Sequence, residues 1–310
     1  MRFPMNPRAT AIVPCHPRNR PTLARTLESV EAAAKGLGVE TVVVDDIESR
    51  GSSWARNEGL RRAKGDVVFF LDADDTVKPA FFKRMLDVLE ASGADLAMSS
   101  FECAPLKRDY SLSGNAAIRE AMLPAFFGYT FDDVRRWNAG GDLDARRDLG
   151  SVCRCAFRRA FVEAHSIRFD EGLRVYEDAP FLAECACFAD RVVSMPDVLY
   201  DYVPGEAGNT FATTEPDRYY AYKFAALANR KAIASRAGFD VLQYFGASVV
   251  FSALELFRAR RGFFRYAEDP VVARAFEEFP VSARHPVAAL AVKICGVLAR
   301  HACNRQRRGE

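Results

Sequence analysis

The sequence lacks the features that mark several common classes of protein. It has no charge excess, because 43 basic residues stand against 41 acidic ones in 310 residues, and a net charge of +2 gives no general attraction to nucleic acid. Its longest uncharged stretch, residues 241–254, is too short to cross a bilayer. The first seven residues lack the apolar core of a signal peptide. We therefore expect a cytoplasmic protein with no transmembrane helix and no nucleic-acid partner.

The eight cysteines also lack the spacing of a zinc site. Cys153 and Cys155 form one C-x-C pair, and Cys185 and Cys187 form another, whereas zinc knuckles use C-x2-C. The second pair falls in a helical pattern, where residues two apart point to different sides. We expect reduced, mostly buried thiols.

The first hundred residues alternate between strand and helix patterns. Apolar runs predict buried strands at residues 10–14, 41–44, 67–71 and 95–101. Helical spacing predicts helices between them, from about Pro21, from a cap at Ser52 or Ser53, and from Pro79. This alternation is typical of a doubly wound, mainly parallel α/β sheet.

The pattern is weaker in the second half of the chain. Residues 107–150 contain a helical piece near 116–127 and a polar loop at 138–148. Strand and helix patterns resume at residues 152–203, and the chain reads as helices from residue 215 onward. Arginines alternate with aromatic residues near the C-terminus and crowd its last residues. This composition fits either a peripheral membrane contact at the inner face or a packed helical cap with a solvated basic end.

The most informative feature is an apolar strand that ends in three acids. The run from Val67 to Leu71 is followed by Asp72, Asp74 and Asp75. Open α/β sheets bind ligands at the carboxyl ends of their strands. Crowded carboxylates repel one another unless a cation lies between them, and a divalent metal carrying a phosphorylated ligand is the simplest such cation. The sequence therefore predicts a nucleotide or phosphate site that uses Mn²⁺ or Mg²⁺.

A series of motifs in order resembles the family 2 glycosyltransferases of the GT-A fold. They lie at residues 11–14, 42–46, 55–66 (A-R-N-x-G-L), 71–75 (D-x-D), 167–169, 176–181 (E-D) and 199–202. The resemblance implies a GT-A domain at 1–210, with a nucleotide-binding half at 1–105, an acceptor and catalytic half at 106–210, and a helical extension at 211–310. It also implies inverting, metal-dependent transfer from a nucleotide-diphosphate sugar, UDP-sugar favoured, to a glycan or lipid-linked acceptor in cell-surface polysaccharide or glycolipid synthesis.

The resemblance assigns a donor site. It places Pro14 at this site and gives Asp45 or Asp46 hydrogen bonds from a uracil-type base, although two acids that end a strand can also simply solvate a turn. Arg56 would pair with the diphosphate through its planar fork, unless it is an ordinary exposed helix arginine.

The D-x-D motif completes the donor site in this resemblance. Asp72 faces the ribose side, Ala73 lines the nucleotide sugar, and Asp74 ligates the metal. Asp75 either supports the metal or caps the helix that begins near Pro79, and the cap is favoured.

The E-D motif supplies the catalytic residues. Inverting transfer needs a base for the proton of the acceptor hydroxyl, and the family pattern favours Asp178, with Glu177 orienting it or contacting the acceptor. The same acids would also suit the positive end of a helix dipole, and both interpretations can hold together.

Two features keep other interpretations open. Only eight residues separate Asp46 from Ala55, which leaves no room for the family's customary helix and third strand. A non-catalytic nucleotide-sugar-binding module is therefore one alternative. Residues 72–76 also satisfy D-x-D-x-T, so a haloacid-dehalogenase-like phosphatase with Asp72 as nucleophile, Asp74 as acid–base and magnesium is another.

Overall fold

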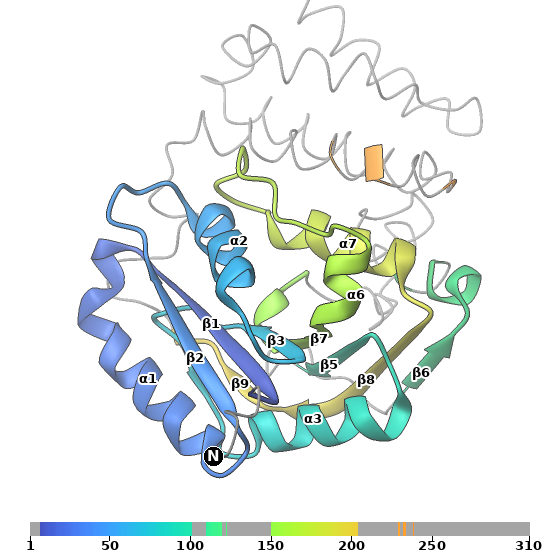
Figure 1. Cartoon of the computed structure of the whole chain (residues 1–310), viewed down its shortest axis with the longest axis horizontal. Helices are drawn as coiled ribbons and strands as arrows, with labels where there is room; N and C mark the ends of the chain where they lie inside the picture. The colour runs from blue at the N-terminus through green and yellow to red at the C-terminus, as the bar shows by residue number, and fades with distance from the viewer. Residues whose placement is uncertain are drawn as a thin grey trace, which may run out of the picture.

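The computed structural model describes residues 7–100, 110–119, 122, 150–203, 229, 232–233 and 238. Within them, seven strands form one mixed sheet in the order β2-β1-β3-β7-β5-β8-β6 (Figure 1). These strands are β1 (Ala9–Cys15), β2 (Val39–Asp45), β3 (Val67–Phe70), β5 (Leu96–Ser100), β6 (Tyr110–Ser113), β7 (Cys155–Arg158) and β8 (Arg191–Val198). A small second sheet pairs β4 (Thr76–Val77) with β9 (Tyr200–Asp201).

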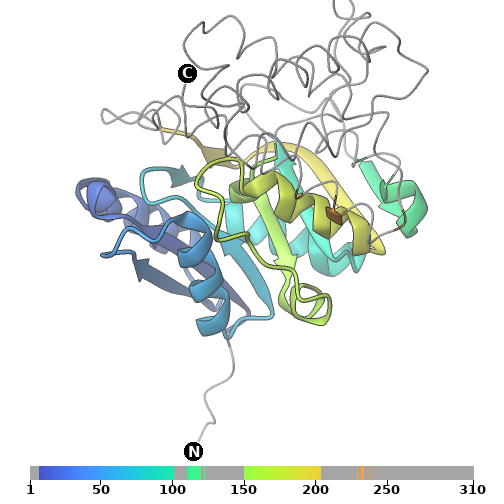
Figure 2. The same ribbon diagram turned by 90° about the horizontal axis from the view of Figure 1, so that it is seen from above.

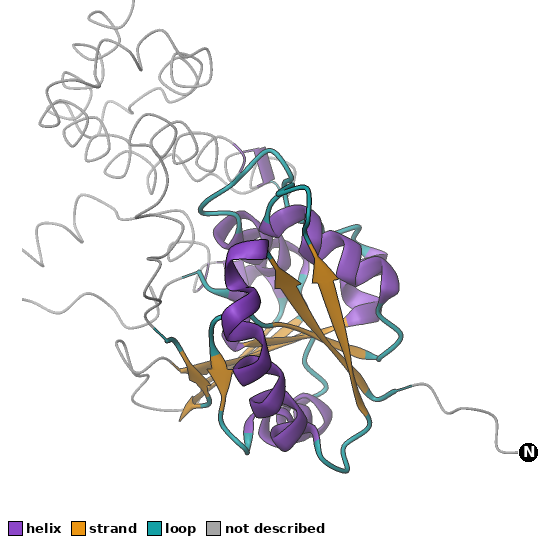
Figure 3. Cartoon of the chain, turned by 90° about the vertical axis from the view of Figure 1, so that its left-hand side faces the viewer, coloured by secondary structure: helices purple, strands orange, loops and turns teal. Residues whose placement is uncertain are grey.

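Helices lie on both faces of the large sheet. α1 (Arg20–Ala34) and α3 (Phe81–Ser92) contact each other on one face, and α2 (Ser52–Arg62), α6 (Arg159–Ala164) and α7 (Asp178–Phe188) lie on the other (Figure 1). Figure 3 shows the strands between these helices. Two 3-10 turns, η1 (Pro17–Asn19) and η2 (Val152–Arg154), precede α1 and β7. The arrangement is the α/β fold that the sequence predicts.

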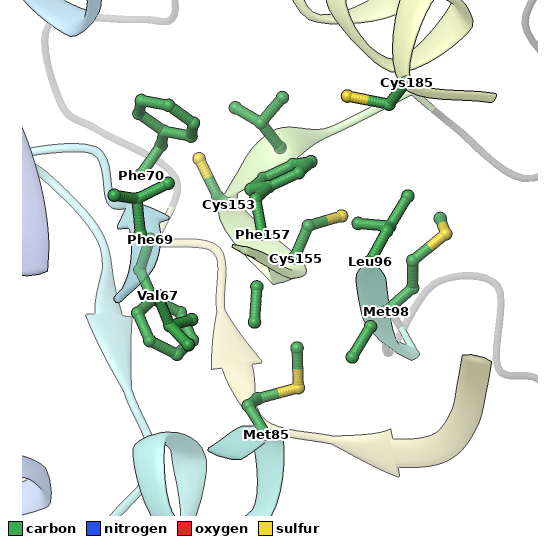
Figure 4. Close-up of a cluster of buried hydrophobic side chains, with 14 of the residues drawn as sticks. Val67, Phe69, Phe70, Met85, Leu96, Met98, Cys153, Cys155, Phe157 and Cys185 are labelled. Carbon is green, nitrogen blue, oxygen red and sulfur yellow. The ribbon is translucent and has the colours of Figure 1, made fainter. Parts of the chain in front are cut away.

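Two phenylalanines of β3, Phe69 and Phe70, pack against the helix layers on the two faces of the sheet. Successive residues of a strand point to opposite faces. Phe69 therefore packs edge-on against Phe82 of α3, with ring centroids 5.0 Å apart. Phe70 packs on the other face against Phe169 and against Phe181 of α7, at 5.0 and 5.6 Å. Figure 4 shows Phe69 and Phe70 among the buried side chains of the core. The strand that carries the acids is thus fixed from both sides.

The sheet is less parallel than a doubly wound pattern predicts. β1 runs parallel to β2 and β3, and β5 runs parallel to β8. Between β3 and β5, however, lies β7, which is antiparallel to both. Residues 150–203 thus lie beside residues 9–100 and contribute strands to the same sheet (Figure 2). The sheet is mixed because a strand that is distant in the sequence is inserted at its centre and because the edge strand β6 runs antiparallel to β8.

Two local predictions in the first half are wrong. β2 is an edge strand, and only Val44 among its residues is buried, so the strand is not covered on both faces. Neither serine caps α2, because Gly51 occupies the N-cap position with φ 108° and no side chain caps the helix. The hydroxyls of Ser52 and Ser53 instead bond to Glu177 and to the carbonyl of Leu173.

Glycines of the A-R-N-x-G and A-K-G segments allow close packing. A Cβ at Gly59 of α2 would overlap the side chain of Ile12 in β1. A Cβ at Gly65, just before β3, would overlap the backbone of Ala9. Both glycines are therefore required for α2 and the chain after it to lie directly against β1.

Five cysteines lie in the described part of the chain, and all are buried free thiols, as predicted. No helix among the described residues is long and apolar enough to cross a membrane. The polar loop at 138–148, most of the helical piece near 116–127, and nearly all of the C-terminal extension, including its basic end, lie outside the described residues.

Candidate functional site

The turn that follows β3 and carries Asp72, Asp74 and Asp75, here called the acidic turn, is held by one face of α1. The ladder between β1 and β3 ends where the N–H of Leu71 donates to the carbonyl of Ile12. The carbonyls of Ala73, Asp74 and Asp75 then accept hydrogen bonds from three side chains of α1, Thr22 (2.9 Å), Arg25 (2.6 Å) and Thr26 (2.7 Å). The spacing of these three residues places them on one side of the helix. The turn therefore presents its carboxylates from a fixed backbone.

Asp75 does not cap a helix. The cap of α3 is Ala80, without a side-chain bond, and the carboxylate of Asp75 instead accepts hydrogen bonds from the hydroxyl of Tyr200 and the N–H of Val203. Burial, together with the charge of Asp72, raises the pKa of Asp75 to about 7. Asp75 thus ties the acidic turn to the segment after β9, and the cap predicted from the sequence is wrong.

Arg56 lies at the centre of the site rather than on a helix surface. Its side chain is 3% exposed. One terminal nitrogen, Nη2, pairs with Asp72 at 2.8 Å, and the other, Nη1, pairs with Glu177 at 2.7 Å and with Asp178 at 3.0 Å. The ring of Phe169 lies 5.3 Å from the guanidinium carbon. The structure thus brings Arg56, Asp72, Glu177 and Asp178 together, although no pattern in the sequence indicates that they touch.

The E-D pair stands at the start of α7, as predicted. The helix begins at Asp178, and Glu177 occupies its N-cap position. The second carboxylate oxygen of Asp178 accepts a hydrogen bond from the N–H of Val152 at 3.1 Å, and Ser52 donates to Glu177 at 2.6 Å. Tyr176, just before the pair, has φ 63°, so the chain turns sharply into the helix. Two other segments, α2 and η2, therefore orient the two carboxylates.

The pKa of Asp178 lies in the range that suits a general base near neutral pH. Burial raises the pKa of this carboxyl to about 7, against the lowering effect of the Arg56 cation, while the charges of Glu177 and Asp72 raise it further. One guanidinium faces three carboxylates, so the cluster carries an excess of negative charge that favours a bound proton. A general base works best when its pKa lies near the working pH.

Asp45 is the last residue of β2 and Asp46 follows it, and the two carboxylates have different partners. Asp46 is buried, and its two oxygens accept hydrogen bonds from the N–H groups of Arg50 and Gly51, each at 2.7 Å. Asp45 is half exposed and pairs with Arg20 at 3.1 Å. Residues 46–51 alone join β2 to α2, which confirms that no helix or strand lies between them. Asp46 shapes this short loop, and Asp45 remains accessible at its side.

The remaining donor-site residues lie at the same edge of the sheet. Pro14 is buried near the end of β1, beside Val44 of β2. Ala73 is buried in the acidic turn. Apart from Arg56 of α2, the predicted site residues therefore lie at the carboxyl ends of β1, β2 and β3 or at the start of α7, where an α/β sheet binds its ligands.

Asp74 is the acid to which the resemblance assigns a divalent metal. Burial, together with the charge of Asp72, raises its pKa, and a cation at this point would remove that penalty. The described residues contain no group of three His, Cys, Asp or Glu side chains that could hold a metal alone. Mg²⁺ is commonly bound by one or two carboxylates plus the phosphates of a substrate. The residues present therefore fit a metal that binds together with a diphosphate.

Ser52 and Tyr200 are functional-site residues that sequence reasoning misjudged or missed. Ser52 was assigned to a helix cap, but its hydroxyl bonds to Glu177, 125 residues away. Tyr200 belongs to a recognised motif, yet its bond to Asp75 is equally distant in sequence. For Tyr200, a polar residue inside a motif is the only available signal, and it does not name the partner.

Comparison with known proteins agrees with the motifs. The model described as Glycosyl transferase family 2 matches residues 47–138. The chain is 30% identical over 208 residues to the succinoglycan biosynthesis protein ExoO of Rhizobium meliloti, covering 58% of this chain and 56% of ExoO. It is 28% identical over 156 residues to the uncharacterized glycosyltransferase EpsJ of Bacillus subtilis, covering 49% of this chain and 42% of EpsJ. The chain thus matches about half the length of these relatives.

Solved structures show the same fold. A crystal structure of S. aureus TarS 1–349 in complex with UDP-GlcNAc superimposes with a TM-score of 0.65 at 16% identity, covering 98% of this chain and 92% of that one. The same TarS fragment with UDP gives a TM-score of 0.57 at 15% identity over the same shares. The fold is therefore of the GT-A type, as the glycosyltransferase resemblance predicts. The chain is thus similar to glycosyl transferase family 2 over residues 47–138, and its motifs, its fold and its relatives agree with that family.

Proposed function

We propose that the protein is an inverting, metal-dependent glycosyltransferase that moves a sugar from a UDP-sugar to an acceptor hydroxyl. One observation carries the proposal. Asp72 at the end of β3 and Asp178 at the start of α7 share a single buried guanidinium, that of Arg56. The donor-side acid and the candidate base thus meet in one hydrogen-bonded cluster at the ligand-binding edge of the sheet.

The donor would lie across the carboxyl ends of β1, β2 and β3. Asp45 is the accessible acid that can accept hydrogen bonds from a uracil-type base, since both oxygens of Asp46 already hold the loop. Pro14 and Ala73 would form the apolar floor of the nucleotide-sugar site, and Asp72 would face the ribose. Asp74 would hold the metal, whose charge neutralises the departing nucleoside diphosphate.

Asp178 would act as the base. The acceptor oxygen attacks the anomeric carbon as its proton passes to a carboxylate oxygen of Asp178, and the bond from that carbon to the diphosphate oxygen breaks. The attack comes from the side opposite the leaving group, so the configuration inverts. Glu177, held by Ser52 and Arg56, would orient the base or contact the acceptor.

The relatives suggest the class of acceptor. ExoO is named for succinoglycan biosynthesis, and a further relative, 26% identical over 185 residues and matched over 23% of its length, is a teichoic acid poly(glycerol phosphate) polymerase of Staphylococcus epidermidis. We extend this to a glycan or lipid-linked acceptor in surface polysaccharide synthesis. UDP-GlcNAc, bound in the TarS structure, is the first donor to test.

The test is a donor panel with manganese. UDP-, GDP- and dTDP-sugars are incubated with the protein, with and without EDTA, and nucleoside diphosphate release is followed against Asp178→Asn as the control. Release from one UDP-sugar that needs metal and Asp178 supports the proposal. Donor binding by calorimetry without any release, in the presence of candidate glycan acceptors, would instead favour a non-catalytic binding module.

A further inference from the structure

We infer that Arg56 is a positioning residue that holds the carboxylates of Asp72 and Asp178 in fixed relation, and that it is not a ligand of the donor diphosphate. The inference rests on the proposed function, because it takes Asp178 as the base. It replaces the role that the A-R-N motif suggested for this arginine. Four features of the structure support this inference. They are the burial of the Arg56 guanidinium, its planar geometry, the three segments that it joins, and the charges around Asp178.

The guanidinium of Arg56 is surrounded by carboxylates and an aromatic ring. Its side chain is 3% exposed, and both terminal nitrogens are engaged by carboxylates at 2.7–3.0 Å. The aromatic ring of Phe169 lies beside it, and that ring is itself stacked on Phe181 at 4.1 Å. To reach a diphosphate, Arg56 would have to leave Glu177 and Asp178, which are only 12% and 19% exposed, without their cation, which is unfavourable.

The planar fork explains why an arginine is needed here. The two terminal nitrogens of a guanidinium are fixed in one plane, whereas a lysine offers one flexible point charge. Nη2 bonds to Asp72, and Nη1 bonds to Asp178 and Glu177. The spacing between the donor-side acid and the base is therefore set by covalent geometry rather than by flexible side chains.

The fork also joins parts of the fold that are far apart in the sequence. Arg56 lies on α2, Asp72 follows β3, and Asp178 begins α7. Phe70 and Phe181 pack against each other at 5.6 Å and fix β3 to α7 from the core side. Arg56 completes that connection on the ligand side. Its loss should displace reacting groups without removing any contact to the donor.

The charges around Asp178 make the inference testable by pH. From α2 it is faced by Arg56, from its own segment by Glu177, from the end of β3 by Asp72, and from η2 by the thiol of Cys153 and the N–H of Val152. Arg56 is the cation among these groups. Removing its charge should therefore leave Asp178 protonated to higher pH.

The first experiment compares Arg56→Lys with the wild type, with Arg62→Lys on the same helix as the control. Arg62 pairs only with Glu58 on the helix surface among the described residues. Arg56→Lys should fold, keep the dissociation constant of UDP with manganese within about twofold, and lose roughly 10²-fold in kcat, as small misplacements of reacting groups do. Weaker UDP binding with unchanged kcat would overturn the inference, and so would a wild-type kcat and affinity.

The second experiment separates positioning from charge. In Arg56→Met the acid limb of the pH–rate profile should move to higher pH, whereas in Arg56→Lys it should stay in place. The carboxyl titration of Asp178 can be followed by ¹³C NMR without turnover, so this result is interpretable even if the proposed transferase activity fails. An unmoved titration in Arg56→Met would contradict the inference. If Arg56→Met does not fold, Arg56→Lys still decides through kcat and UDP affinity.

Discussion

Tyr200→Phe removes a single oxygen atom that two acids of the turn depend on. Tyr200 is 4% exposed, and its hydroxyl donates to a carboxylate oxygen of Asp75 and accepts from the N–H of Asp72 at 3.4 Å. The other oxygen of Asp75 is held by the N–H of Val203 at 2.8 Å. The substitution fits the same space and leaves one carboxylate oxygen and one N–H without this partner.

The expected loss follows from these contacts. At pH 8, where Asp75 with its pKa of about 7 is mostly ionised, a hydrogen bond to this charged group contributes about 1.5–3 kcal/mol. The long bond to the Asp72 N–H adds little, so we expect the free energy of unfolding at this pH to fall by about 2 kcal/mol. The turn also loses one of its attachments, which should weaken manganese-dependent UDP binding. Both effects should appear together if Tyr200 positions the acids.

The assay is urea unfolding followed by calorimetry with UDP and manganese. Tyr202→Phe is the matched control, because Tyr202 is 59% exposed, and its change should stay within about 0.5 kcal/mol. A fall in the urea midpoint with an unchanged m-value identifies a loss of stability. If Tyr200→Phe behaves like Tyr202→Phe in both measurements, the argument that this hydroxyl anchors the turn is refuted.

Three further predictions follow from the site and the core. Asp74→Ala should abolish the gain in UDP affinity that manganese gives, because the metal loses its protein carboxylate, and equal calorimetric affinities with and without Asp74 would refute this. The kcat/KM of the wild type should rise with pH through about 7 and then level off, because Asp178 is a base only when ionised and its pKa is raised to about 7, so a flat profile from pH 5 to 8 would contradict the assignment. Gly65→Ala should lower the free energy of unfolding by about 1–3 kcal/mol, because the new Cβ overlaps the backbone of Ala9, and an unchanged urea midpoint would show that the chain can move aside.

The sequence predicts the local part of this fold well. Three elements form close to their predicted bounds: the strand β1, the helix near Pro21 and the strand before Asp72. Each can be predicted because its hydrophobic pattern and the residues at its ends lie within the segment itself. The insertion of β7 between β3 and β5 leaves no such trace, because it depends on contacts between segments about 60 to 90 residues apart in sequence.

The site divides in the same way. The motifs locate the acids and the E-D pair, because residue type and order are visible in the sequence. They do not show that Arg56 is buried among carboxylates or that Asp75 bonds to Tyr200, because partners are set by tertiary packing. The motifs therefore identify the candidate residues, whereas the fold determines which groups each of them contacts.

The most direct test of the account compares Asp178→Asn with the wild type in UDP release from the accepted UDP-sugar at saturating donor and manganese. The amide is nearly isosteric but cannot take the proton, so turnover should fall roughly 10²–10⁴-fold while donor affinity stays unchanged. Glu177→Gln should cost less. Near-normal turnover in Asp178→Asn with an inactive Glu177→Gln would reverse the assignment, and normal turnover in both would remove this pair from the mechanism.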